Sequence, residues 1–208
     1  MLDETSLLLA VHELARRDDD LGAVVERFGP PPLWGREPGF PTLVWMILEQ
    51  QVSLASARAA YDRLGAAVGE ITPASVLQLE DGTLRTAGFS RQKTEYTRRL
   101  AAAILEGRFD PQTLETMDDD AVRATLVEQK GIGPWTAEVY LLMALRRPDA
   151  WPAHDLGLLV AAQEVKRLPQ RPSPAELAEL AEPWRPYRAV AARILWHHYL
   201  STPRGVRG

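Results

Sequence analysis

Apolar residues recur along most of this chain at spacings of three and four positions, which places side chains on one face of an α-helix. The segments "TSLLLAVHELARR" (5–17) and "SRQKTEYTRRLAAAILEG" (90–107) show the pattern clearly. No segment alternates apolar and polar residues between turn pairs, as a half-buried strand would. The sequence therefore predicts an all-α fold of roughly ten helices.

Start and stop signals divide the rest of the chain into further helices. Serine, threonine or aspartate precedes many of the apolar runs, and glycine or proline often follows them. The proline-rich stretch "PPPLWGREPGFP" (30–41) predicts a rigid connection. The remaining helices are expected over 19–29, 42–51, 53–68, 72–79, 81–88, 118–129, 134–146, 155–168, 173–180 and 185–200.

The amino-acid composition excludes several kinds of site and reaction. The chain has no cysteine, which excludes thiolate metal sites, iron–sulfur clusters and a thiol nucleophile. No apolar run approaches about 18 residues, and the acidic N-terminal segment does not resemble a signal peptide. We therefore expect a protein that does not enter membranes and that is cytoplasmic, or associated with the nucleoid in a prokaryote. A monomer is the default expectation. The net charge of −4 argues mildly against nucleic acid as a binding partner. Net charge is a weak test, however, because binding of nucleic acid depends on where the charges lie on the surface.

The stretch "EQKGIGPWTAEVY" (128–140) joins two apolar helix faces by an unusual turn. Gly131 and Gly133 permit positive φ and a close approach of the backbone to a ligand. Ile132 can pack between the helices, and Pro134 suits the first position of the second helix. Exposed N–H groups and the helix dipole would then form a site for a phosphate. The alternative is a tight helix–helix turn with a proline start, which would explain the same sequence without a bound phosphate.

The wider context of this turn resembles a known family. "LVEQKGIGPWTAEVYLLMAL" is similar to the helix-hairpin-helix of DNA glycosylases, in which a glycine/proline-rich loop and an aspartate follow. "DAWPAHDLGLLVA" lies at the expected distance downstream. "MILEQQVSLASARAAYDRL", "LRTAGFSRQKTEYTRRLAAAI" and "WRPYRAVAARILWHHYL" resemble other helices of this family, in matching order. The 3-methyladenine DNA glycosylase II branch is the most similar.

The resemblance places the family's catalytic aspartate at Asp155. An aspartate at a helix start is also a common N-cap, and the two roles are compatible. N–H donors and the helix dipole would keep the carboxylate ionised. A fixed anion would then stabilise the positive charge that builds on the sugar as an N-glycosidic bond breaks, and could orient or deprotonate water.

Trp135 occupies the slot where strand-cutting relatives carry a lysine that forms a Schiff base. The resemblance therefore implies a monofunctional glycosylase without lyase activity. Lys130 is the nearest lysine, but it precedes the glycines and is expected to contact phosphate or solvent.

Aromatic residues are the candidates for the base pocket. Trp196 matches an aromatic that faces the flipped base, where it would attract a cationic alkylated purine. Trp135, Tyr140 and His154 are further candidates, with Trp151 and Tyr187 as weaker ones. Packing in the core is the alternative for Trp135, and a place on an apolar helix face is the alternative for Trp196.

The remaining candidates concern DNA and a cation. Gln51 matches the slot that fills the gap left by a flipped nucleotide, although Gln50 and Gln51 could simply end a helix. Arg91 and Lys93 are expected on the DNA side. No cofactor is required by the resemblance, but backbone carbonyls of Gln129, Gly131 and Gly133 are candidate ligands for a Na⁺ or K⁺ ion.

The predicted organisation is a single catalytic unit over 1–208 with two helical lobes. One lobe covers 42–149 and contains the helix-hairpin-helix at about 118–146; the other combines 1–41 with 150–201, and 202–208 is a flexible tail. The base pocket would lie between the lobes. The expected activity is excision of alkylated purines from duplex DNA. The alternatives are another lesion, such as mispaired uracil or thymine or an oxidised base, and a DNA-binding module without catalysis.

Overall fold

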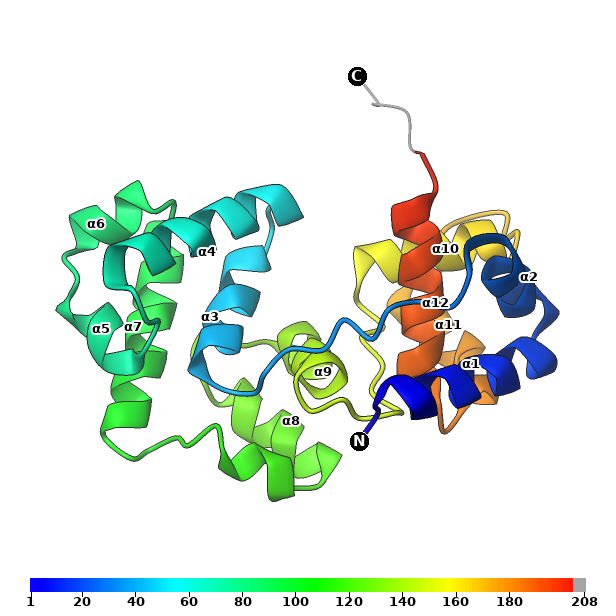
Figure 1. Ribbon diagram of the computed structural model, residues 1–208, viewed down its shortest axis with the longest axis horizontal. Coiled ribbons are helices and arrows are strands. Elements are labelled where there is room, and N and C mark those ends of the chain that lie inside the picture. Colours follow the sequence, from blue (N-terminus) through cyan, green and yellow to red (C-terminus); the bar gives the residue numbers. More distant parts are fainter. Residues whose placement is uncertain (204–208) are drawn as a thin grey trace. The chain divides into compact units, whose positions relative to one another are not determined.

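A computed structural model of the protein describes residues 1–203, which contain helices and no β-strand (Figure 1). The predicted all-α class is confirmed. The helices are α1 (Glu4–Arg17), α2 (Asp19–Phe28), α3 (Phe40–Glu49), α4 (Leu54–Val68), α5 (Pro73–Gln78), α6 (Asp81–Thr86), α7 (Arg91–Leu105), η1 (Thr113–Thr116), α8 (Asp119–Val127), α9 (Pro134–Met143), α10 (Leu156–Val165), α11 (Pro174–Leu180), η2 (Glu182–Trp184) and α12 (Arg188–Ser201).

The chain forms two compact units. The first combines Met1–Gly35 with the described residues from Leu141 onward, and the second is Arg36–Tyr140. The lobe boundaries predicted after residues 41 and 149 thus fall after residues 35 and 140 in the structure, the latter inside α9. Of the tail predicted over 202–208, residues 204–208 lie outside the described part of the chain.

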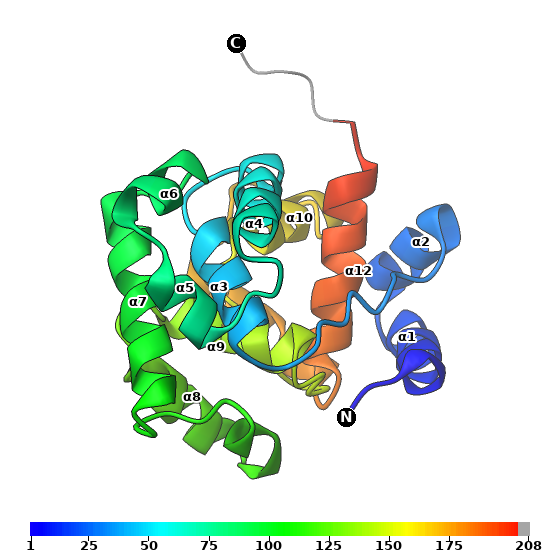
Figure 2. The same ribbon diagram turned by 60° about the vertical axis from the view of Figure 1, so that its left-hand side comes forward.

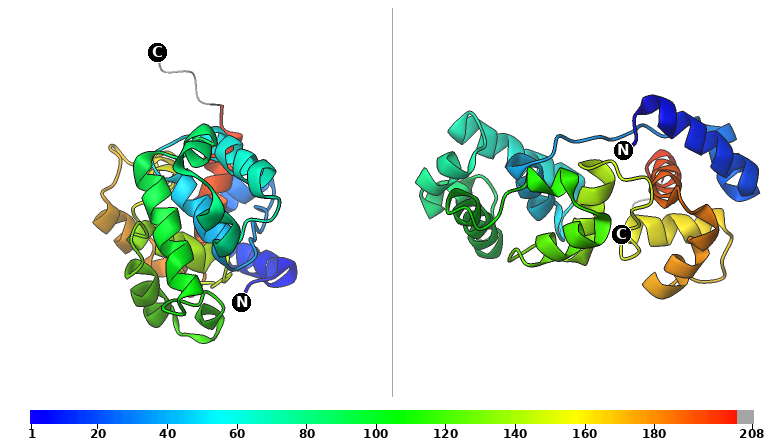
Figure 3. Two further views of the ribbon diagram at one scale, coloured as in Figure 1. Left: turned by 90° about the vertical axis from the view of Figure 1, so that its left-hand side faces the viewer. Right: turned by 90° about the horizontal axis from the view of Figure 1, so that it is seen from below.

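Helix α12 is the centre of the first unit. It packs against α1, α2 and α10, and the view from below in Figure 3 shows the red α12 between the blue α1 and α2 and the yellow α10. Every residue of α12 from Ala189 to Leu195 is buried. Because α12 carries Trp196 directly after this buried run, the position of Trp196 is set by the core of the unit.

Arg193 is the charged residue inside this core. Its guanidinium donates to the carbonyls of Leu33 (2.8 Å), Leu142 (2.8 Å) and Ala189 (3.0 Å). Burial lowers the pKa of Arg193 to about 10. The three hydrogen bonds tie the 29–35 connection, the last turn of α9 and α12 together, and they satisfy a group that would otherwise be costly to bury.

Helix α10 is held at its C-terminal end by α2. Lys166 Nζ lies 2.6 Å from Asp18 Oδ1 and 3.0 Å from Asp20 Oδ2. Trp184 Nε1 donates to the other oxygen of Asp18 at 2.7 Å. Helix α10 also packs along α12, so α10, which Asp155 precedes as its N-cap, is fixed along its length.

In the second unit, α7 packs against α3, α5 and α6, as Figure 2 shows. Helix α3 is almost entirely apolar, and Phe40 and the run from Thr42 to Leu48 are buried. Helix α3 ends at Glu49, two residues earlier than predicted. The reason is local: Gln50 is extended, Gln51 has φ +57°, and Ser53 caps α4 by accepting from the Ser56 N–H at 3.2 Å.

Candidate active site

Asp155 is the N-cap of α10, as predicted, and its backbone is extended. Its Oδ1 accepts two hydrogen bonds, from the Leu158 backbone N–H at 2.9 Å and from Trp196 Nε1 at 2.9 Å. The side chain is half-buried. The two donors and the N-terminal end of the helix stabilise the negative charge of the carboxylate and fix its orientation.

Two rings of α12 face the first turn of α10. A Cβ added to Gly157 would lie 3.5 Å from Trp196 Cδ1, 3.6 Å from Tyr199 Cδ1 and 3.1 Å from Asp155 Oδ1. Trp196 and Tyr199 are three residues apart, so they share one helix face. The structure therefore gathers Asp155, Gly157, Trp196 and Tyr199. Tyr199 is not among the candidates predicted from the sequence, although the i, i+3 spacing from Trp196 could have indicated it.

The structure gives Trp196 a role beyond the predicted one. Its N–H edge is directed at Asp155, so the indole orients the carboxylate. An aromatic surface and an anion are thereby held together at one helix N-terminus. This combination suits a cation, because the carboxylate attracts it and the ring system stabilises it further.

For the base release that the sequence resemblance predicts, we expect Trp196→Phe to lower the rate by roughly 10- to 100-fold, since a hydrogen bond to a charged group is lost while an aromatic ring remains. Single-turnover rates at saturating enzyme would measure this. Trp45→Phe is the matched control, because the buried Trp45 Nε1 has no hydrogen-bond partner among the described residues. Equal rates for the Trp196→Phe variant and this control would show that the Trp196–Asp155 bond is catalytically idle.

The other predicted pocket residues are scattered. His154 is exposed beside Asp155, and Trp135 is half-buried in the first turn of α9. Tyr140 is fully buried, its hydroxyl accepts from the Gly39 N–H at 2.9 Å, and burial raises its pKa to about 12, so it is a core residue in this structure. A pocket that combines Trp135 with Asp155 stays a prediction, because the two residues belong to different units.

The two weaker pocket candidates make packing contacts within the first unit. Trp151 stacks edge-to-face on Trp184, with ring centroids 5.6 Å apart, in the core. The Arg17 guanidinium lies 5.9 Å from the ring centre of Tyr187. Trp151 is thus a buried residue in the core of the first unit.

In the hairpin between α8 and α9, Gly131 has a positive φ, whereas Gly133 does not use the positive φ that glycine permits. Gly131 has φ +93°, in a region that favours glycine, and its Cα lies against the ring of Tyr96. Ile132 is buried, as predicted for a residue that packs between the two helices. A Cβ added to Gly133 would meet no atom within 4 Å. Lys130 is exposed at the turn.

Among the predicted DNA contacts, Gln51 and Arg91 are exposed. Lys93 differs from the prediction in its geometry: Nζ donates to the Leu48 carbonyl at 2.6 Å. Partial burial lowers the pKa of Lys93. The ammonium group therefore caps the C-terminal end of α3 and contributes to the fold of the second unit.

The three carbonyls predicted as cation ligands each accept an N–H group. Gln129 O accepts from Ile132 N (2.9 Å), Gly133 O from Ala137 N (3.0 Å) and Gly131 O from Gln50 Nε2 (2.9 Å). Each carbonyl oxygen has a second lone pair, so one accepted hydrogen bond leaves it able to bind a cation, and the monovalent-cation site stays a prediction.

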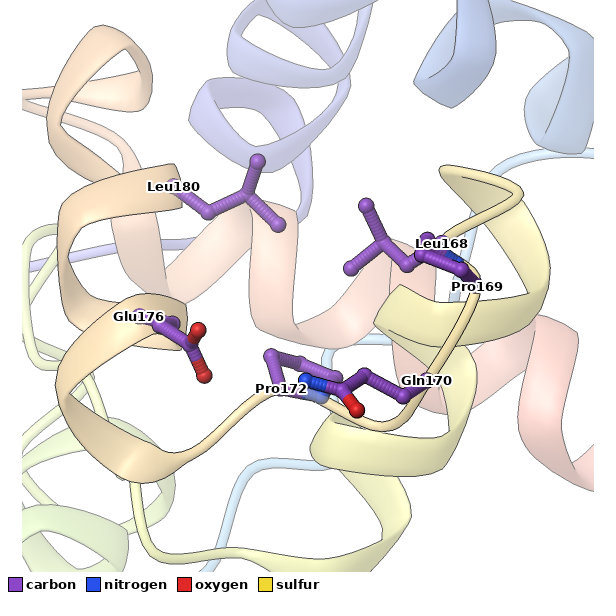
Figure 4. A pocket seen from close by; sticks show the side chains of 6 residues that line it. All are labelled: Leu168, Pro169, Gln170, Pro172, Glu176 and Leu180. Carbon is purple, nitrogen blue, oxygen red and sulfur yellow. The ribbon is translucent and has the colours of Figure 1, made fainter.

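A hollow follows the other end of α10. Figure 4 shows its lining residues, among which Leu168 and Leu180 project toward the hollow from opposite sides. The carboxylate of Glu176 accepts from the Ser173 N–H at 2.7 Å, as part of the N-cap of α11. Since Asp155 lies at the opposite end of α10, this hollow is separate from the site.

A helix-hairpin-helix followed by an aspartate that caps the next helix is the arrangement expected of the helical DNA-repair class to which the sequence is similar. The chain belongs to the HhH-GPD superfamily of base excision DNA repair proteins, whose profile matches residues 44–186. The predicted family is thereby confirmed.

Individual relatives agree with this assignment. The chain is 31% identical to the DNA-3-methyladenine glycosidase of Bacillus halodurans, with a TM-score of 0.75 over 92% of this chain and 89% of that one. A Schizosaccharomyces pombe 3-methyladenine DNA glycosylase in complex with abasic DNA is 25% identical, with a TM-score of 0.81 over 92% and 95% of the two chains.

A DNA-3-methyladenine glycosylase of Bacillus subtilis is 26% identical over 91% of this chain and 66% of its own length. The chain thus spans just under two thirds of that relative. None of the helices in residues 1–203 combines the length and the apolar character needed to cross a membrane.

Proposed function

We propose that this protein is a monofunctional DNA glycosylase that hydrolyses the N-glycosidic bond of alkylated purines, of the 3-methyladenine type, flipped out of duplex DNA. The observation that carries the proposal is the arrangement at α10, where Asp155 Oδ1 accepts from both Leu158 N and Trp196 Nε1. A module that only binds DNA needs phosphate contacts, but it needs no oriented carboxylate beside aromatic rings.

In the proposed reaction, the bond between C1′ and the base nitrogen breaks and its electron pair leaves with the base. Positive charge develops on the sugar, and the Asp155 carboxylate stabilises it. A water oxygen then bonds to C1′, and the proton it loses passes to Asp155 or to solvent. The products are the free base and an abasic site.

The preference for alkylated purines follows from charge. A 3-methylated adenine is cationic, so it leaves readily and needs little acid catalysis. The rings of Trp196 and Tyr199 beside Asp155 offer the surroundings that attract such a base. The same feature gives a neutral, mispaired or oxidised base little advantage.

Duplex DNA is the proposed partner, and a monomer is the proposed working form. The hairpin supports the contact with DNA, since a Cβ added to Gly133 would meet no atom within 4 Å and Lys130 is exposed. Gln51, exposed with φ +57°, is the proposed residue for the gap left by the flipped nucleotide.

Borohydride is expected to trap no covalent enzyme–DNA adduct. The slot that carries a lysine in strand-cutting relatives is Trp135, so no amine is placed to form a Schiff base. Denaturing gel electrophoresis after reduction on lesion DNA would measure this. An adduct that disappears in Lys130→Ala would show instead that Lys130 is a nucleophile.

The direct test is release of free bases from methylated duplex DNA, identified by chromatography, with deoxyuridine and 8-oxoguanine duplexes in parallel. Release of 3-methyladenine alone, or well above the other bases, supports the proposal. Preferential release of uracil or 8-oxoguanine would transfer the activity to another lesion. Binding without release of any base would indicate a DNA-binding module.

A further inference from the structure

Gln50, at the C-terminal end of α3, connects this helix to the hairpin. Its Nε2 donates to the Gly131 carbonyl at 2.9 Å and to Thr136 Oγ1 at 3.2 Å. Gly131 lies in the turn before α9, and the buried Thr136 lies in the first turn of α9. A single side-chain amide thus links α3 to both parts of the hairpin.

Helix α7 contributes to the same place. Lys93 Nζ donates to the Leu48 carbonyl at 2.6 Å, two residues before Gln50. The ring of Tyr96, whose hydroxyl accepts from Gln92 Nε2, packs on Gly131. We call these five residues, Leu48, Gln50, Lys93, Tyr96 and Gly131, the hairpin junction.

Directly after Gln50, residues 51–54 form an exposed segment, which we call the tip. Gln51, with φ +57°, is an uncommon left-handed residue that is not glycine, and such a conformation persists when its surroundings determine it. Val52 and Leu54 of the tip are 45% and 61% exposed, which is unusual for apolar side chains next to a buried helix. Because Leu48 and Gln50 are both anchored, the tip leaves α3 in a fixed direction.

We propose that Gln50 is a positioning residue that fixes the tip, residues 51–54, relative to the hairpin, so that both contact one DNA duplex without rearrangement. This inference rests on the proposed function, in which the hairpin contacts phosphate and the tip enters the gap of the flipped nucleotide. Fixing two contact elements in advance lowers the ordering cost of binding. In this role Gln50 acts through its bonds to Gly131 and Thr136, and not by contact with the base or the sugar.

Gln50→Met tests this proposal, because methionine keeps the approximate length of the side chain but has no N–H donor. Gln112→Ala, an exposed glutamine of the same unit, is the matched control. The readouts are hydrogen exchange at the Ile132 amide in the free protein, the Kd for undamaged and abasic-site duplexes by fluorescence anisotropy, and the single-turnover rate at saturating enzyme.

For Gln50→Met we expect faster exchange at Ile132 and a Kd for abasic-site DNA raised by roughly five- to tenfold, the loss of about one hydrogen bond. The saturating rate should change by less than twofold, and the Gln112→Ala control should match wild type. Unchanged exchange, or faster exchange with an unchanged Kd, would overturn the proposal. So would a loss confined to the saturating rate, since that would place Gln50 in the chemistry. If wild type releases no base at all, the proposed function fails, while exchange and anisotropy still decide the role of Gln50.

Discussion

Asp155→Asn is expected to reduce base release by at least roughly 100- to 1,000-fold, the loss typical when a group that stabilises transition-state charge is removed. The amide has no negative charge to place beside the cationic sugar. Its oxygen can still accept from Leu158 N and Trp196 Nε1, so the local geometry should survive. Single-turnover release of 3-methyladenine from methylated duplex would measure the effect.

Asn and Asp are nearly equivalent N-caps, so Asp155→Asn separates the effect of the negative charge from the effect of capping. The free energy of unfolding should therefore change by less than about 1 kcal/mol, and the affinity for lesion DNA should largely persist. Asp3→Asn is the control, because Asp3 caps α1 in the same unit by accepting from the Ser6 N–H at 2.7 Å. Undiminished excision by Asp155→Asn would remove Asp155 from the mechanism.

The sequence predicted the helices, the hairpin and the N-cap at Asp155 because each depends on local signals: helical periodicity, a glycine turn, and an aspartate before an apolar run. The Trp196–Asp155 bond could not be predicted in this way, since its partners are 41 positions apart and meet only through the packing of α10 on α12. The resemblance to a known family, whose segments occur in the same order, predicted both residues as part of the site, but it did not predict the hydrogen bond between them.

Lys93 and Tyr140 are predicted from the sequence as site residues, but the structure directs their polar atoms to backbone groups of the second unit. A basic residue near a helix start and an aromatic residue after the hairpin both suit a DNA-facing site by composition. Tertiary structure instead directs Lys93 to the Leu48 carbonyl and buries Tyr140 against the Gly39 N–H. From the sequence, Gln50 is only a helix end, because its link to Gly131 spans 81 positions. Side chains that can satisfy either solvent or a buried carbonyl are ambiguous until the packing is known.

The two hairpin glycines should respond differently to alanine, which makes them a matched pair. In Gly131→Ala the new Cβ would overlap the Tyr96 ring and lie 2.7 Å from Tyr96 Cβ, at a backbone φ of +93° that disfavours alanine. We expect a loss of about 2–4 kcal/mol in the free energy of unfolding, the sum of the left-handed backbone penalty and overpacking. In Gly133→Ala the Cβ meets no atom within 4 Å, so stability should change by less than about 0.5 kcal/mol. Urea denaturation would measure both.

Both glycine variants should nevertheless weaken binding to every duplex alike, since the contact that they disturb is to backbone phosphate, which carries no sequence information. Gly133→Ala acts by adding a methyl group to the surface that approaches the phosphate, and Gly131→Ala acts by displacing the turn. Tyr96→Ala in the Gly131→Ala background removes the ring but keeps Cβ, so it should restore part of the lost stability. A binding loss confined to one lesion would contradict the phosphate contact, because a lesion-specific effect requires that the hairpin reads the base.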